Sequence, residues 1–109
     1  MHIKEAQQEV DKRIREYGGY WQPLSMFARL AEETGEVGRA MNVLYGDKRK
    51  KHEEDGKELK EELADVFFTL LAMCNALEID IEKEFLNKNN KTHDKYKEAY
   101  NPNGSKRHS

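Results

Sequence analysis

Apolar residues recur every three or four positions through most of this 109-residue chain, which is the spacing of one face of an α-helix. No stretch shows the sustained apolar and polar alternation of a strand. Only two prolines and seven glycines interrupt the pattern. The sequence therefore predicts an all-α fold, a bundle of about four helices in a single domain over residues 1–100, followed by a flexible tail over residues 101–109.

Two helices are expected in the first half of the chain. The first should run from Ile3 to the glycine pair at 18 and 19, because glycine commonly ends a helix. The second should begin at Pro23, since proline is favoured at the first helical position. Trp21, just upstream, could pack back onto Met26 as a hydrophobic staple. Residues 46–56 contain no apolar side chain and are expected to form a solvated loop.

The third helix is expected over roughly Lys57 to Leu77, and its apolar residues cover more than half of its circumference. So wide an apolar surface in so small a chain needs covering on two sides, which predicts a homo-oligomer whose second subunit supplies the second cover. Asp80 can cap a fourth, shorter helix, in which Ile81, Phe85 and Leu86 should face inward. After Asn87 the chain turns polar.

Composition limits the partners and the compartment of the protein. With 19 basic and 21 acidic residues the net charge is −2, so no overall positive field would attract nucleic acid or an anionic membrane. The sequence contains no long apolar run, so neither a signal peptide nor a membrane span is expected, and the protein is expected to be cytoplasmic. The single cysteine, Cys74, lies among apolar residues and is expected to be a buried thiol.

Two pairs of acids border the apolar stripes of the second and third helices. Glu33 and Glu36 are three residues apart and therefore project side by side, as do Glu62 and Asp65. The apolar stripe of the second helix includes Leu24. If the two helices pack antiparallel through their apolar stripes, the four carboxylates can meet in one cleft. Crowded carboxylates must take up protons or hold a cation, and a set of oxygen ligands favours Mg²⁺, or Mn²⁺ as a substitute, over zinc.

Other interpretations of these acids remain open. In a chain that is 37% charged, acids three residues apart also occur by chance on a solvated helix face. Gly35 and Gly38 favour a packed site, because a mid-helix glycine costs about 1 kcal/mol relative to alanine and close approach would compensate for it. A di-iron carboxylate bundle would need Glu-x-x-His on two helices, and no histidine here meets that spacing, so iron is disfavoured.

The segments EETGEV (residues 32–37) and ELKEELADVFFTLLAMCNAL (residues 58–77) resemble the MazG-like family of all-α nucleotide pyrophosphohydrolases. The likeness extends over nearly the whole chain and is greatest to the short, single-domain members. The family signature of Glu-x-x-Glu, a spacer and Glu-x-x-Asp falls on Glu33, Glu36, Glu62 and Asp65. The resemblance therefore implies that these four residues are the metal ligands and the catalytic acids, with one of the glutamates as general base.

The resemblance also implies an activity and an assembly. The expected reaction is Mg²⁺-dependent hydrolysis of a (d)NTP between the α and β phosphates, which gives a (d)NMP and pyrophosphate. A house-cleaning role in the nucleotide pool and a dimeric or tetrameric bundle would follow. A nucleotide- or metal-binding module without turnover, or a helical interaction module, remains the alternative function.

Phosphate and base contacts are expected from two further segments. Similar proteins carry a phosphate-binding Lys-x-Asn-x-Arg pattern in the segment after the fourth helix, and Lys88 and Asn90 match it here, whereas Thr92 replaces the arginine. Lys91 or Lys95 could supply the missing charge. The aromatic residues that precede the second helix are expected to enclose the nucleobase, although Trp21 could equally be only a staple. These aromatics are Tyr17, Tyr20 and Trp21.

Overall fold

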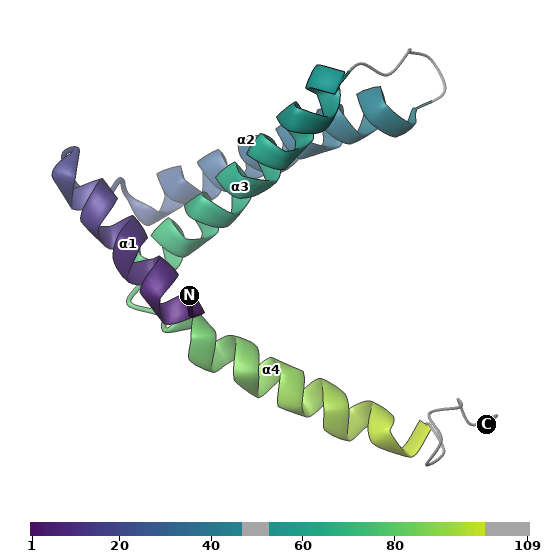
Figure 1. Cartoon of the computed structure of the whole chain (residues 1–109). Coiled ribbons are helices and arrows are strands. Elements are labelled where there is room, and N and C mark those ends of the chain that lie inside the picture. Colours follow the sequence, from purple (N-terminus) through teal and green to yellow (C-terminus); the bar gives the residue numbers. More distant parts are fainter. Residues whose placement is uncertain (47–52, 100–109) are drawn as a thin grey trace.

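A computed structural model describes residues 1–46 and 53–99 of the chain, and this part is helical throughout apart from turns (Figure 1). The helices are α1 (Ile3–Glu16), α2 (Pro23–Tyr45), α3 (Glu53–Ala76) and α4 (Ile81–Tyr96), followed by a 3₁₀ turn, η1 (Lys97–Ala99). The prediction of an all-α fold with four helices is confirmed. The predicted tail, residues 101–109, lies outside the described residues.

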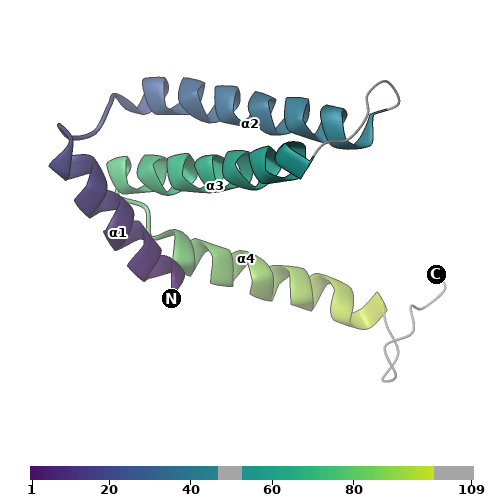
Figure 2. The same cartoon turned by 45° about the horizontal axis from the view of Figure 1, so that its top comes forward.

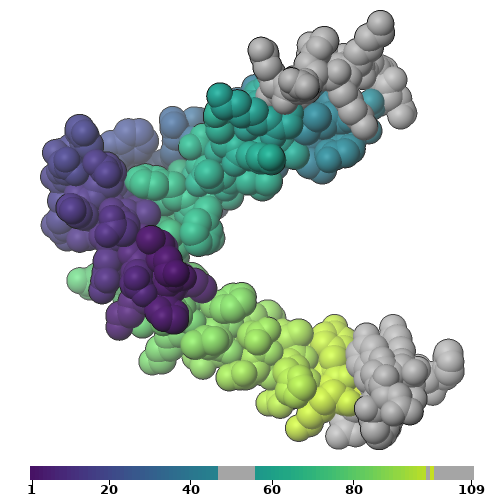
Figure 3. All heavy atoms as spheres, viewed as in Figure 1, coloured from purple at the N-terminus to yellow at the C-terminus, as the bar shows by residue number. Residues whose placement is uncertain are grey.

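The four helices form two arms that meet at α1. Helices α2 and α3 pack antiparallel along their length, and α1 lies across the end of this pair (Figure 2). Helix α4 leaves the same junction in a different direction and does not return to α2 or α3. The space-filling view shows that the arm made by α4 stands well apart from the arm made by α2 and α3 (Figure 3).

The junction of α1, α3 and α4 holds the small hydrophobic core. Val10 of α1 packs with Leu71 and Ala72 of α3, and partly buried apolar residues from α1 and α4 surround them. The buried side chain of Gln7 connects the same three helices, since its amide nitrogen donates to Asn75 Oδ1 of α3 at 2.9 Å and its Oε1 accepts from the Ile81 amide of α4 at 3.1 Å. These contacts fix α1 against the end of α3.

The helix ends follow from local chemistry. Gly18 and Gly19 adopt φ angles of 110° and 93°, a region that only glycine enters easily, and the Gly19 amide donates to the Ile14 carbonyl at 2.9 Å. Pro23 begins α2, as predicted. Asp80 caps α4 by accepting from the Lys83 amide at 3.2 Å. The predicted starts of α1, α2 and α4 are confirmed.

Two predicted boundaries are wrong. Helix α3 begins at Glu53, so residues 53–56, which were expected in the loop, are helical; residues 47–52 lie outside the described part. Helix α4 continues to Tyr96 rather than ending after a short apolar start. Residues 53–56 and most of the second half of α4 are polar, so apolar spacing alone underestimated the length of both helices.

Helix α2 packs through a different face from the one predicted. Its buried residues are Met26, Glu33, Ala40 and Leu44, with Leu30 half-buried between them. Leu24, expected within the packed stripe, is 78% exposed. Two neighbouring apolar faces run along α2, and the spacing could not show which one meets α3.

The apolar residues of α4 are divided in the same way. Ile81 packs against the core, as expected, whereas Phe85 and Leu86 are more than half exposed, so the prediction that both face inward is wrong for one chain. Cys74 is buried, as predicted, and burial raises the pKa of its thiol. Among the described residues, no helix is both long and apolar enough to cross a lipid bilayer.

Candidate active site

Acidic side chains from α2 and α3 lie close together at the interface of the two helices. Carboxylate oxygens of Glu33, Glu62 and Asp65 all lie within 4.8 Å of one another. Oxygens of Glu36, Glu58 and Glu62 form a second group with the same spacing. Because Glu62 belongs to both groups, the five carboxylates form one continuous cluster, which we call the acid row.

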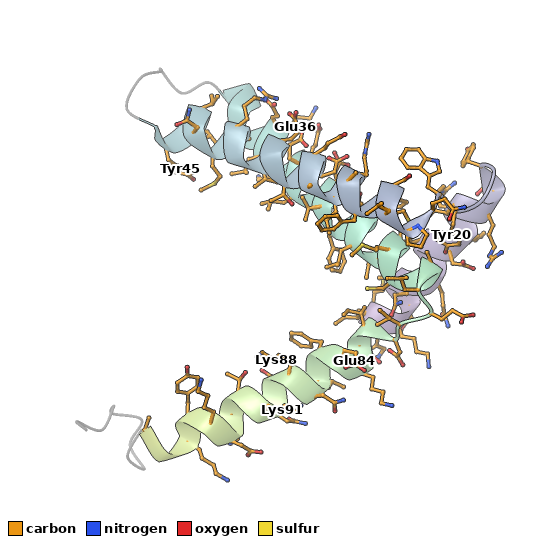
Figure 4. All side chains as sticks on the ribbon, turned by 180° about the vertical axis from the view of Figure 1, so that it is seen from behind. Tyr20, Glu36, Tyr45, Glu84, Lys88 and Lys91 are labelled. Carbon is orange, nitrogen blue, oxygen red and sulfur yellow. The ribbon has the colours of Figure 1, made fainter. Side chains whose placement is uncertain are left out.

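The register of the two helices produces the acid row. Glu33 occupies the middle of the α2 face that packs on α3, between the half-buried Leu30 and Val37, and is only 7% exposed. Glu36 lies nearly one helical turn further along α2, at the edge of this face, and points out from the helix pair (Figure 4). Glu62 and Asp65 have the same spacing on α3. The buried acid is thus held by the packing of its apolar neighbours.

The negative charges in the row affect one another. Burial raises the pKa of Glu62 above its usual range, and the charges of Asp65 and Glu36 raise it further, followed by those of Glu33 and Glu58. When no cation is present, the carboxyl group of Glu62 therefore keeps its proton to a higher pH than an isolated glutamate does.

Two arginines of α2 neutralise part of the row. The Nε of Arg29 lies 2.7 Å from Glu33 Oε1. Arg39 Nη2 donates to Glu36 Oε2 at 3.0 Å and also to the carboxylate of Glu58, and these two acids raise the pKa of Arg39. Five carboxylates and two guanidinium groups leave the row with excess negative charge, and its all-oxygen ligand set fits a hard divalent cation.

A cavity of about 310 Å³ lies against one end of the acid row. Glu33, Asp65 and Arg29 contribute to its wall, and so do the aromatic residues Tyr20 and Trp21 from the connection between α1 and α2. The cavity therefore has charged side chains on one part of its wall and aromatic rings on another. Its volume suits a small organic molecule.

Helix α1 holds Tyr20 in position beside the cavity. The Tyr20 hydroxyl donates to the Asp11 carboxylate, and the Arg15 guanidinium lies over the ring, 5.6 Å from its centre. The hydrogen bond from Tyr20 is the main reason why the pKa of Asp11 is lowered. The pKa of Tyr20 is raised, first by burial and then by this same hydrogen bond.

The other residues predicted for binding lie outside the cavity. Tyr17 is 77% exposed and does not line it. Trp21 lines the cavity together with Met26, so its two predicted roles, staple and base contact, remain compatible. Lys88, Asn90 and Lys91 are exposed on α4, and Figure 4 shows Lys88 and Lys91 on the arm that points away from Glu36. Within one chain they do not approach the acid row.

The predicted reason for Gly35 and Gly38 is wrong within one chain. No described atom lies within 4 Å of a Cβ placed at either position, so neither glycine is required there for close approach. Sequence reasoning also missed Arg29 as a lining residue and did not include Glu58 among the candidate ligands. Arg29 stands one helical turn before Glu33, and this spacing was the available signal for the ion pair.

Known proteins are similar to this chain over most of its length. Residues 21–99 match the model of the MazG nucleotide pyrophosphohydrolase domain. The chain is 46% identical over 82 residues to the Bacillus subtilis protein YpjD, a match that covers 74% of each chain. The crystal structure of YpjD superposes with a TM-score of 0.70 at 40% identity and covers 93% of this chain and 96% of YpjD.

A second solved structure is similar to the same extent. It is the crystal structure of a Bacillus-conserved MazG protein, described as a nucleotide pyrophosphohydrolase, and it superposes with a TM-score of 0.73 at 39% identity. The match covers 84% of this chain and 90% of that protein. Identities near 40% over most of both chains indicate more than a shared helical architecture.

Proposed function

We propose that this chain, which belongs to the MazG nucleotide pyrophosphohydrolase family, hydrolyses (d)NTPs with Mg²⁺ as cofactor. As a member it is a hydrolase that acts on acid anhydrides. The specific reaction proposed is cleavage between the α and β phosphates to a (d)NMP and pyrophosphate. Removal of unwanted nucleotides from the pool is the cellular role that this reaction would serve.

One observation supports the proposal above all others, namely that acids from two helices converge beside a cavity that also has aromatic walls. The proposed ligands of the cation include Glu33, Glu62 and Asp65, whose carboxylate oxygens lie within 4.8 Å of one another. Glu36 is the fourth proposed ligand, because one of its oxygens lies within the same distance of Glu62. A bound Mg²⁺ would neutralise negative charge on the phosphates as it develops during phosphoryl transfer.

The protein's own residues have three proposed tasks in the reaction. One of the glutamates of the acid row acts as general base and accepts a proton from the attacking water. The oxygen of this water bonds to the α phosphorus as pyrophosphate leaves. Tyr20 and Trp21 stack on the base, which any base permits. The walls of the cavity fix the nucleotide between these aromatic rings and the acid row.

A homo-oligomer would complete the proposed site. Lys88, Asn90 and Lys91 remain our candidates for phosphate binding, but they lie on the separate arm formed by α4 (Figure 4). They could reach the acid row only from another subunit. A dimer or tetramer is therefore part of the proposal, and it would also cover the exposed apolar faces of α2 and α4.

The test is an assay for pyrophosphate release from a panel of ordinary and modified (d)NTPs, with and without Mg²⁺. Wild-type protein should release pyrophosphate from at least one of them only when Mg²⁺ is present. Glu36→Gln and Asp65→Asn should reduce turnover at least a hundredfold while the circular dichroism spectrum stays unchanged. Glu61→Gln is the matched control, because Glu61 is exposed on α3 and lies outside both carboxylate groups. Full turnover in both site variants would refute the assignment.

The alternative, a nucleotide-binding module without turnover, makes a different prediction. It requires tight, Mg²⁺-dependent binding of a triphosphate that is recovered intact after prolonged incubation. A purely structural helical oligomer would bind no nucleotide, and Mg²⁺ would leave its melting temperature unchanged. Isothermal titration with the same panel separates both alternatives from the enzyme.

A further inference from the structure

Arg29 has a position that neither the family match nor the sequence signature explains. Among the described residues that line the cavity it is the single cation, and the lining also includes two acids, Glu33 and Asp65. The aromatic rings of Tyr20 and Trp21 belong to the same wall. A nucleotide with its base on these rings and its phosphates at the acid row would pass Arg29.

The ion pair with Glu33 leaves much of the guanidinium group free to bind something else. The contact to Glu33 Oε1 uses Nε, whereas a guanidinium group carries five N–H donors in a planar fork. The side chain of Arg29 is 52% exposed, and that of Glu33 only 9%. Such a fork binds phosphate oxygens in pairs, which a lysine ammonium group cannot do.

Glu33 is also one of the carboxylates proposed to hold the cation. A divalent ion at Glu33 would compete with Arg29 for the same carboxylate, because both positive charges use its oxygens. Once the ion is bound to the Glu33 carboxylate, the Arg29 guanidinium group can turn from Glu33 to a ligand in the cavity without leaving the buried charge of Glu33 unpaired. The two events would then be coupled.

We propose that Arg29 is a phosphate-binding residue for the nucleotide, which Glu33 holds beside the cavity until a divalent cation replaces it. This inference rests on the proposed function, since it assumes a triphosphate at the acid row. It gives the chain a phosphate contact of its own, independent of the lysines on α4.

The proposal predicts effects of opposite sign for one substitution. Arg29→Gln removes the competitor for Glu33, so Mg²⁺ without nucleotide should stabilise this variant at a lower concentration than wild type, measured as the midpoint of the melting-temperature increase. Binding of an α,β-methylene analogue, which cannot be cleaved at that bond, should weaken about tenfold at saturating Mg²⁺, as expected for a lost charge-assisted hydrogen bond. The common deoxynucleoside triphosphates serve as the parent compounds of these analogues.

Two further variants separate a direct contact from a general effect of charge. Arg29→Lys keeps the charge without the fork and should recover less than half of the lost analogue affinity. Arg39→Gln removes an equal charge from the other end of the acid row, away from the cavity, and should weaken analogue binding less than threefold. Equal losses of analogue affinity in Arg29→Gln and Arg39→Gln would overturn the proposal.

The experiment also separates this inference from the proposed function. Absence of pyrophosphate release from wild-type protein refutes the enzyme, whereas analogue binding reports on Arg29 without any turnover. Unchanged analogue affinity in Arg29→Gln, or no analogue binding by the wild type, refutes the role of Arg29. Circular dichroism of each variant checks that it is folded, because Arg29→Gln leaves the buried carboxylate of Glu33 without its counter-charge.

Discussion

Glu33 is the residue at which charge and packing conflict most directly. It lies on the buried face of α2 among apolar side chains, and Arg29 supplies its counter-charge from the same helix. A buried carboxylate is tolerated only when it is paired or holds a metal. The conflict is the physical reason for regarding this position as functional rather than structural.

The residues of the acid row were predictable to different degrees. The spacing of Glu33, Glu36, Glu62 and Asp65 already indicated that they share helix shoulders. Glu58 was not among the predicted ligands, because its membership of the acid row depends on the register between α2 and α3, which helical periodicity alone does not determine. The arginine pairs could be foreseen as helical spacings but not as counter-ions of a cluster.

Glu62 should make the stability of the metal-free protein depend on pH. Its folded-state pKa is raised above the ordinary value of 4.5, so between these two pKa values the folded state binds a proton that the unfolded state has lost. The melting temperature without divalent ions should therefore fall as pH rises from 4.5 upward through the folded pKa. Thermal melts across this range would measure the effect.

Glu62→Gln is the informative variant, since it should flatten this part of the pH profile, and Glu61→Gln should preserve it. Mg²⁺ favours the ionised carboxylate, so the stabilisation by Mg²⁺ should grow as pH rises through the same interval. A profile that Glu62→Gln leaves unaltered would mean that this carboxyl group titrates normally.

The helices show which level of organisation a sequence can define. Apolar spacing, Pro23 and Asp80 sufficed to predict four helices and three of their starts. The same spacing could not decide which face of α2 meets α3, because Leu24 and Phe27 form an apolar edge as convincing as the one that includes Leu30. That choice is made by packing between helices, which periodicity within one helix does not encode.

A substitution at Gly35 tests the intrinsic helix stability of α2 separately from its packing against α3. Gly35 lies on the side of the helix opposite the face that meets α3, and no described atom is within 4 Å of a Cβ built there. Gly35→Ala should therefore stabilise the protein by about 1 kcal/mol, the intrinsic helix preference of alanine over glycine. Urea denaturation would measure this gain.

Loss of stability in Gly35→Ala would show instead that another chain approaches α2 closely at this point. Gly38→Ala serves as the comparison, because Gly38 lies on the exposed apolar face that includes Phe27 and Met41. Destabilisation at position 38 alone would locate a neighbouring subunit on that face.

The shape of the whole chain is that of an incomplete structure. Its radius of gyration is 18.4 Å, against about 13 Å for a compact domain of about 100 residues. Large apolar side chains are exposed on α2, α3 and α4, among them Phe27, Phe67 and Phe85. So many exposed large apolar side chains on a short chain are typical of a protein that buries them against another subunit, which supports the homo-oligomer that the width of the third helix predicted.

The oligomer can be tested by measuring molar mass with light scattering after size-exclusion chromatography. Wild-type protein should elute with the mass of two or four chains. Phe27→Glu should reduce the molar mass of the assembly, because it places a charge on the exposed apolar face of α2. Lys12→Glu, on the exposed side of α1, should leave the molar mass unchanged. A monomeric wild type at micromolar concentration would contradict the proposed assembly.

Binding of Mn²⁺ as a substitute for Mg²⁺, followed by electron paramagnetic resonance, tests most directly whether α2 and α3 together hold a cation. Wild-type protein should bind Mn²⁺, and Glu33→Gln on α2 and Asp65→Asn on α3 should each weaken binding at least tenfold, while Glu61→Gln should not. Undiminished binding in both site variants, or no binding by the wild type, would contradict a site shared between the two helices.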